Sequence, residues 1–529
     1  SLLSMWSFFP VVPWHNGGTM WKYLLITLLG TAVCGFGAET VSPRGYYAVT
    51  EYGAVGDGIV DDTAAFQAAL DAAATVGGWV TVPPVAGGKG YVLTRTVTVP
   101  EGVALIGSPS GVGSNVRAVF GLPDTHIVGA KIFARPQPED YAGPLKKPLF
   151  FLHPGATVRG LWILYDQQPM PSDEEFADPA SPYHYATFEA ARAGFIKDHV
   201  KPCGPTFYSA NAVNTVVEDI VCDRCYDFLY FVQSGKCHFN RITMYGYKRG
   251  LVFQHAPDVV HLSNLEWVPN GGPLSPGGPY NGKTYTWVYG AIVSQPDNVG
   301  LHLGQVDGYS FYDVTFFSVH TAVRFGHSKA FPMVDPVTGK TAPDLAPGTG
   351  PWGDLVGLRA DQCAVGLHFV WPSHLTNRIS NALLFTAYND GQTFPAVAGT
   401  GSFENVARQA AFLVEPTHTK ANNAGYVSTC MCTNTLVASF NDAGRFGPAA
   451  SNAAEANGRV FLFGGDLFLE LTGFQVNAPY RKDFLWAASE GIGRVHTRIR
   501  GFLLGFEPQP DQTIEWPTSL SGPPPLKGD

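Results

Sequence analysis

The chain has 529 residues, with 34 Lys and Arg against 43 Asp and Glu, so its formal net charge is −9. No Lys/Arg-rich run offsets this charge, which argues against nucleic acid as a partner. The 60 Gly and 41 Pro are typical of a chain with many turns, and charged residues make up only 15% of it.

The first residues differ in character from the rest. An apolar run, Tyr23–Gly35, is too short for a comfortable membrane span and is followed by small residues. Residues 1–38 are therefore predicted to be upstream sequence and a signal peptide that is cleaved near Gly37. An uncleaved anchor and acylation at Cys34 are the alternatives. We expect an extracellular or periplasmic protein with no membrane span after cleavage.

The stretch Tyr52–Ala74 predicts a short helix. Asp61 or Asp62 is suited to accept hydrogen bonds from its first free amides. One apolar stripe follows at helical spacing, formed by Phe66, Ala69, Leu70 and Ala73. Short strands with turn residues between them are predicted in Gly77–Pro84, Gly90–Pro100 and Gly102–Gly107.

This order of a YGAxGDGxxDDTxAxQxAxDAA helix and short strands resembles the start of the pectate-lyase-like right-handed parallel β-helix proteins (pectate lyase superfamily 3, rhamnogalacturonase-like). The resemblance implies an all-β solenoid whose open end is capped by the helix. Asp57, Asp61 and Asp62 are then turn and cap residues. The activities of this family are diverse, so the resemblance bears on fold more than on reaction.

A weak repeat supports the solenoid. Several segments, each predicted to form two strands joined by a turn, align without gaps. Their last residues form a column of Phe231, Phe253, Phe325 and Phe369. Alternation predicts that this column lies inside the stack. A polar turn position precedes each segment and is occupied by Asp219, Arg241, Asn264 and Asp313. It corresponds to the turn where related β-helices stack Asn side chains.

Long inserts interrupt the coils at 167–205, 269–286 and 326–353, on both sides of the sheet that ends in the Phe column. Long ordered loops are usually functional, so we expect them to wall a groove that binds an extended chain. Decoration of the fold and contacts between subunits are the alternatives.

Side chains that point outward over this groove are the candidate site. The predicted outward column contains Tyr230, Val252, Ile292, Arg324 and His368, and the adjacent edge contains Gln233, His255, Gln295, His327 and Trp371. Arg324 and His368 fall on consecutive coils, about 4.8 Å apart. Arg324 is suited to bind a carboxylate, and His368 or His327 to move a proton in β-elimination. These three are the predicted catalytic residues.

Tyr230, His255 and Trp371, with Trp287 and Tyr289 at the end of an insert, are the predicted sugar-binding residues, because aromatic rings can stack on pyranose faces. A glycosidase needs two carboxylates about 5–9.5 Å apart, which Asp258, Asp297 or Glu415 could supply. Lys248 and His320 are second-choice candidates, and Asp227 with Arg249 is predicted to be a weak surface ion pair. No metal site is predicted: Cys222 and Cys225 read as stacked turn residues, and His238 and His261 as a surface stack.

We therefore predict a single parallel β-helix domain over residues 39–506, with a Pro-rich tail at 507–529. The predicted function is to bind and cleave an acidic polysaccharide, with a lyase on a uronic-acid-containing chain favoured. A polygalacturonase-like glycoside hydrolase and a non-catalytic adhesin or assembly protein are the alternatives. Ca²⁺ is a possible cofactor, as in related lyases. The sequence does not reveal the oligomeric state.

Overall fold

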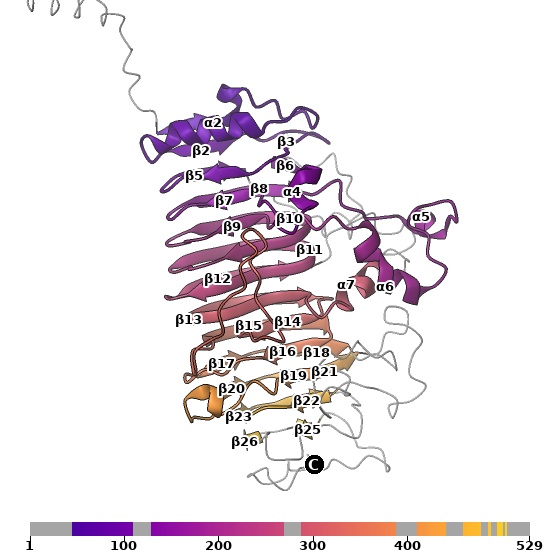
Figure 1. Ribbon diagram of the computed structural model, residues 1–529, viewed down its shortest axis with the longest axis vertical. Helices are drawn as coiled ribbons and strands as arrows, with labels where there is room; N and C mark the ends of the chain where they lie inside the picture. The colour runs from indigo at the N-terminus through magenta and orange to yellow at the C-terminus, as the bar shows by residue number, and fades with distance from the viewer. Residues whose placement is uncertain are drawn as a thin grey trace, which may run out of the picture. The chain divides into compact units, whose positions relative to one another are not determined.

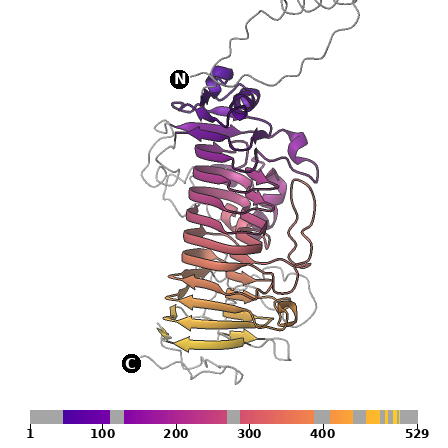
Figure 2. The ribbon, with the colours of Figure 1, turned by 90° about the vertical axis from the view of Figure 1, so that its left-hand side faces the viewer.

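The computed structural model describes residues 45–108, 129–268, 287–387, 410–440 and 459–477, with the short strands 485–487, 495–500 and 503–504. In these residues the strands pair in parallel in three ladders that successive coils extend (Figures 1 and 2). Parallel strands joined by crossover connections wind right-handed in nearly all proteins. The fold is a right-handed parallel β-helix, as the sequence predicted.

The first sheet contains the Phe column. Its strands are β4 (Val97–Val99), β7 (Phe150–Leu152), β9 (Phe207–Ser209), the last parts of β10 (Val216–Phe231) and β11 (Cys237–Ala256), the first part of β13 (Val299–Phe317), β14 (Thr321–Phe325), β16 (Val365–Phe369), β19 (Ala410–Val414), β22 (Arg459–Phe463) and β25 (Leu485–Ala487).

The second sheet follows the first along each coil. Its strands are β1 (Tyr46–Ala48), β2 (Trp79–Val82), β5 (Ala104–Gly107), the first parts of β8 (Thr157–Leu164), β10, β11, β12 (Val260–Trp267) and β15 (Trp352–Cys363), the second part of β13, β17 (Asn377–Ser380), β20 (Thr429–Thr433), β23 (Leu467–Thr472) and β26 (Val495–Arg500).

The third sheet follows the turn with the polar column. Its strands are β3 (Tyr91–Leu93), β6 (Ala130–Ala134), the middle parts of β10 and β11, the last parts of β8, β12, β13 and β15, then β18 (Leu383–Ala387), β21 (Leu436–Phe440), β24 (Gln475–Asn477) and β27 (Leu503–Leu504).

The helices lie outside these ladders. They are η1 (Val49–Tyr52), α2 (Thr63–Ala74), α4 (Pro138–Tyr141), α5 (Asp173–Ala177), α6 (Phe188–His199), α7 (Tyr289–Val293) and η5 (Ala421–Asn423). None of the helices in the described ranges is long and apolar enough to span a membrane.

The polar turn between the second and third sheets has a left-handed backbone. Asp219, Arg241, Asn264 and Asp313 have φ between 51° and 54°. Asp and Asn tolerate this conformation better than other residues with a side chain. Arg241 fits because its guanidinium donates to the Asp219 carboxylate of the coil before it, at 2.8 Å from Nη2 to Oδ2. The predicted turn column is confirmed.

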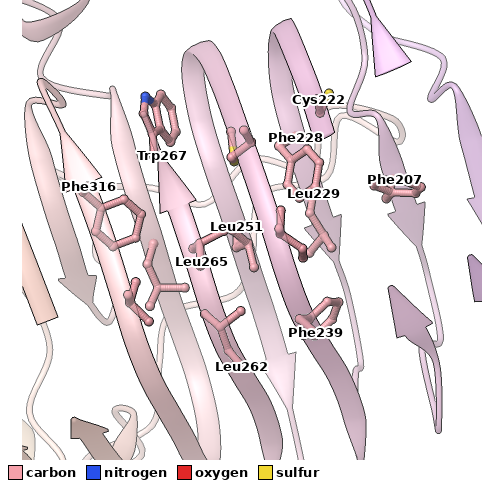
Figure 3. Close-up of a cluster of buried hydrophobic side chains, with 14 of the residues drawn as sticks. Phe207, Cys222, Phe228, Leu229, Phe239, Leu251, Leu262, Leu265, Trp267 and Phe316 are labelled. Carbon is pink, nitrogen blue, oxygen red and sulfur yellow. The ribbon is translucent and has the colours of Figure 1, made fainter. Parts of the chain in front are cut away.

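Apolar side chains of successive coils fill the interior. Phe231 pairs in register with Phe253, and Phe325 with Phe369, whose rings stack 4.8 Å apart. Figure 3 shows Leu229 and Leu251, which pair in register on neighbouring coils, side by side inside the stack. The seven cysteines of the described residues are free and buried in the same way. Cys222 and Cys225, predicted to be stacked turn residues, lie within β10 and are fully buried.

Helix α2 covers the N-terminal end of the stack (Figure 1). Its predicted apolar stripe is buried throughout, from Phe66 to Ala73. Asp61 accepts from the backbone N–H of Thr63 at the helix start. Asp62 does not cap the helix, since its carboxylate accepts from the backbone N–H groups of Val55 and Val92 and ties the preceding loop to β3. Burial raises the pKa of Asp62.

The imidazole of His418 predicts a pH dependence of stability. It is buried, its Nδ1 donates to the backbone oxygen of Asp466 at 2.7 Å, and burial lowers the pKa of His418 to about 4. In the unfolded chain its pKa is about 6.5. The unfolded state therefore binds more protons between these two pH values, and the free energy of unfolding falls as the pH drops from about 6.5 to about 4.

Urea unfolding across this window measures the effect. His418→Asn removes the titrating ring, so its unfolding free energy should depend less steeply on pH than that of the wild type, whatever its absolute value. Equal slopes for the two proteins would show that His418 does not contribute.

Candidate functional site

The outward side chains of the first sheet form a column that is almost fully buried. The strand register aligns them in one row, which we call the outer column: Tyr208, Tyr230, Val252, His302, Arg324 and His368. Arg324 is 5% and His368 2% exposed. The sequence placed Ile292 where the structure has His302. Ile292 lies in α7 instead, and likewise Gln305, not Gln295, pairs with His255.

The insert at 326–351, which we call the strap, covers the outer column. In Figure 1 it rises in front of the strands to the level of β9. The Phe331 ring lies 5.1 Å from the guanidinium carbon of Arg324 and 4.8 Å from the His368 ring. Met333 packs with Tyr230 and Val252. The predicted groove over this sheet is therefore filled by the chain's own side chains, because the insert lies flat on the sheet rather than standing beside it.

Polar contacts fix the strap along its length. Tyr208 donates its hydroxyl to the buried Asp335 carboxylate at 2.9 Å. His327 is 3% exposed, and its Nε2 donates to the backbone oxygen of Pro343 at 2.8 Å. Trp371 donates its indole N–H to the backbone oxygen of Ala346. His327 and Trp371, predicted to act on substrate, thus hold the strap in place.

Arg324, His368 and Glu415 form one buried network under the strap. The Arg324 Nε–H donates to Nδ1 of His368 at 3.1 Å, so this nitrogen acts as the acceptor. Nε2 of His368 then carries the proton and donates to the Glu415 carboxylate at 2.7 Å. Arg324 also donates through Nη2 to the backbone oxygen of Pro296 at 2.6 Å. The structure brings two predicted catalytic residues together, but out of reach of a polysaccharide.

The remaining predicted sugar-binding residues have core or structural contacts. Tyr230 is fully buried and donates its hydroxyl to Gln254. Tyr289 is 6% exposed and packs on Tyr245, so it cannot stack on a sugar from solvent. Trp287 is partly buried against the core and contacts the Phe176 ring.

His255 is half-buried and shares a hydrogen bond with Gln305. The stacked rings of His238 and His261, 4.7 Å apart, agree with the prediction of a surface stack. Within the described ranges, no group of three or more His, Cys, Asp or Glu residues is arranged to hold a metal ion. The possible use of Ca²⁺ stays a prediction.

A pocket of about 670 Å³ is lined by α6, by α7 and by the segment that follows α7. Figure 1 shows these two helices next to each other beside the stack. The insert at 167–205, which was expected to serve the binding site, provides α6. Thr187 caps this helix by accepting from the backbone N–H of Ala190, and buried Phe195 anchors it on the core. The charged and aromatic side chains that line the pocket are Glu189, Arg192, Lys197, Tyr226 and Asp297.

Lys248 controls the charge of the Asp297 carboxylate. Its Nζ lies 2.7 Å from Oδ2 of Asp297 and 5.5 Å from the centre of the Tyr226 ring. Desolvation acts to raise the pKa of Asp297, although its side chain is 58% exposed, but the Lys248 ammonium outweighs it and the pKa is lowered. Burial also raises the pKa of Tyr226, which stays protonated. The pocket therefore offers a charged carboxylate and a neutral phenol, with the Lys248 ammonium paired to the carboxylate.

Next to this pocket, Asp227 and Arg249 form a buried ion pair. The guanidinium donates to both carboxylate oxygens, at 2.8 Å from Nε and 2.6 Å from Nη2. The two side chains are only 3% and 16% exposed. The prediction of a weak surface pair was wrong, because the sequence does not reveal how closely the neighbouring turns cover this column.

The sequence reasoning missed His302 and the pocket. His302 lies as far before Arg324 along the chain as Asp219 lies before Arg241, so the coil length alone would have found it. Asp297 and Lys248 were named only as secondary candidates. Nothing in the sequence shows that α6 folds back beside them.

Residues 46–137 match the family model described as rhamnogalacturonase A/epimerase, pectate lyase-like. The beginning of the chain is therefore similar to this family. This match covers α2 and the first coils, which are the elements that carried the resemblance in the sequence. No curated protein matches the chain.

Several solved structures are similar to this chain. One is a hyperthermoactive exopolygalacturonase from Thermotoga maritima, with 10% identity, a TM-score of 0.40, and coverage of 87% of this chain and 91% of that one. Another is a mutant tailspike protein of E. coli bacteriophage HK620 in complex with hexasaccharide, with 9% identity, a TM-score of 0.46, and coverage of 87% and 66%.

A third is PfbA, a surface adhesin of Streptococcus pneumoniae, with 12% identity, a TM-score of 0.39, and coverage of 87% and 92%. Similarity at this level concerns the fold alone. The chemistry of this chain must therefore be inferred from its own pocket.

Proposed function

We propose that this protein binds an acidic glycan in the pocket between α6 and α7 and cleaves it by hydrolysis. The observation that carries the proposal is the lining of this pocket, in which two carboxylates, Glu189 and Asp297, face a volume of about 670 Å³. Ligand pockets typically measure about 300–1,000 Å³, enough for a short stretch of a sugar chain. Hydrolysis of a glycosidic bond generally uses such a pair of carboxyl groups.

The two carboxylates differ in environment. Asp297 is held ionised by Lys248 at 2.7 Å, which suits a base or nucleophile. Glu189 lies in the first turn of α6 and lines the same pocket, and we assign it the role of the acid that protonates the leaving oxygen. Glycosidases need two carboxyl groups with different roles, one that stays ionised and one that delivers a proton.

The cations of the pocket favour an acidic glycan. Arg192 and Lys197 lie on one helix and line the same space. Arg binds carboxylates through two parallel hydrogen bonds and remains charged at every relevant pH. The ring of Tyr226, half-buried in the pocket wall, is suited to contact a pyranose face.

A lyase acting on a uronic-acid-containing chain is the second candidate, and the same cations favour it. Arg192 or Lys197 would neutralise the uronate, and Tyr226, whose pKa is raised, would donate a proton to the leaving oxygen. Asp297 would then serve as the base. Both reactions depend on Asp297, and they differ in their products.

Asp297→Asn is expected to lower kcat by about 10²–10⁴-fold on the most active member of a panel of acidic polysaccharides, such as polygalacturonate and alginate. New reducing ends without ultraviolet-absorbing unsaturated products would indicate hydrolysis, and both signals together would indicate the lyase. The matched control is Asp258→Asn, because Asp258 also pairs with a lysine, Lys236 at 3.5 Å, but does not line the pocket.

Unchanged activity in Asp297→Asn would rule out this pocket as the catalytic site. Binding of a glycan without cleavage of any member of the panel would support the adhesin alternative instead.

A further inference from the structure

The charged network under the strap reaches the pocket. Arg324 donates to the backbone oxygen of Pro296, the residue immediately before Asp297. Pro296 and Asp297 both line the pocket. We infer that Arg324, His368 and Glu415 together position Asp297 for the proposed reaction, an inference that rests on the function proposed above.

The positions of the protons show which residue of the network orients the next. Because Nδ1 of His368 accepts from Arg324, Nε2 is the nitrogen that carries the proton toward Glu415. Glu415 thus fixes the tautomer of His368, and His368 in turn fixes the plane of the guanidinium. A guanidinium held in this way presents Nη2 to Pro296 at 2.6 Å. Orientation of one polar group by the next is how residues behind an active site act on it.

Burial makes this network costly to maintain. The three side chains are between 2% and 5% exposed, and Phe331 of the strap covers both Arg324 and His368. An apolar replacement of similar volume is often neutral or stabilising for a buried ion pair. Core packing alone therefore does not call for a cation, an imidazole and a carboxylate here, whereas positioning of the pocket does.

The segment around Asp297 is held on its other side as well. Asn298 is fully buried, its Oδ1 accepts from the backbone N–H of His320 at 2.7 Å, and its Nδ2 donates to the backbone oxygen of Lys248 at 2.8 Å. With Arg324 on Pro296, the backbone is anchored on both sides of the proposed catalytic carboxylate. Without Arg324, the segment loses its side-chain anchor at Pro296, and the Asp297 side chain gains freedom.

Charge adds to the effect of geometry. The groups that face Asp297 are Tyr226 on β10, Lys248 and Arg249 on β11, Arg324 on β14, and Glu189, Arg192 and Lys197 on α6. Loss of the Arg324 cation removes one group that keeps Asp297 ionised. In the dependence of kcat on pH, the fall at low pH (the acid limb) should then move to higher pH.

The test compares two variants of Arg324. In Arg324→Met both the anchor and the charge are lost, so we expect kcat to fall at least about 10-fold with KM little changed, and the acid limb to move up. In Arg324→Lys the charge remains, but one ammonium cannot reproduce the planar fork. Its kcat should fall while the acid limb stays in place. Glu415→Gln changes the end of the network that is farthest from Pro296, so it should lower kcat less than Arg324→Met does.

Tyr309→Phe is the control for loss of a buried polar contact. Its hydroxyl donates to Asn377 at 2.7 Å inside the stack, away from the pocket. This variant should alter stability without altering the pH profile. If Arg324→Met folds and has the wild-type kcat and an unmoved acid limb, the inference is overturned. If Arg324→Met does not fold, a wild-type kcat in both Arg324→Lys and Glu415→Gln overturns it.

A second readout separates this inference from the proposed function. In protein labelled with ¹³C at the Asp carboxyl carbons, the resonance that disappears in Asp297→Asn reports the titration of Asp297. Its midpoint should rise in Arg324→Met and remain unchanged in Tyr309→Phe, even if the wild type cleaves nothing. An inactive wild type with this shift would overturn the function alone, and an unchanged midpoint would overturn the inference.

Discussion

Asp227→Ala is expected to lower the free energy of unfolding by about 3–5 kcal/mol. Its carboxylate is 2% exposed and accepts two hydrogen bonds from Arg249. Without the carboxylate, the guanidinium stays in the wall of the stack, over the ring of Tyr230, with its counter-ion removed. Burial lowers the pKa of Arg249, but Asp227 more than compensates and raises it, so the two charges depend on each other.

Asp354→Ala is the matched control, because Asp354 also binds an arginine of the neighbouring coil through Nε and Nη2 of Arg378. This pair lies on the outside of the second sheet, where the Asp354 side chain is 39% and the Arg378 side chain 54% exposed. Exposed pairs contribute about 0–1 kcal/mol. Denaturant unfolding of both variants measures the difference. Similar losses in the two would mean that burial does not decide the strength of these pairs.

Phe66→Ala should cost about 3–5 kcal/mol, the usual range for a buried aromatic residue. Phe66 is fully buried in α2, and its ring lies 5.5 Å from that of Tyr91 on β3. The helix closes the apolar end of the stack, so a cavity here loosens the cover over the first coils. Phe66→Asp would place an unpaired charge in the same site and should prevent soluble expression.

Ile59→Ala is the control for the cap, because Ile59 belongs to the loop before α2 but is 80% exposed. Its effect should remain within about 0.5 kcal/mol. Thermal unfolding of the wild type, Phe66→Ala and Ile59→Ala tests the comparison. A Phe66→Ala variant as stable as Ile59→Ala would show that the helix does not hold the end of the stack closed.

The core of the fold could be predicted from the sequence because its interactions repeat from one coil to the next. Each inward position packs on the same position of its neighbours, so Phe231 and Phe253 align in the sequence as they do in space. The turn at Asp219 follows the same rule, since its left-handed backbone restricts the residues that fit. The apolar stripe of α2 likewise depends on local periodicity alone.

The site did not follow from such patterns, because its parts come from inserts that do not repeat. The strap buries Arg324 and His368, and α6 brings Arg192 and Lys197 to Asp297, from segments far apart in the chain. The length of an insert does not reveal where it lies. Coil periodicity therefore determines the stack and its cap, whereas long-range packing of the inserts determines which polar residues are buried and which line the pocket.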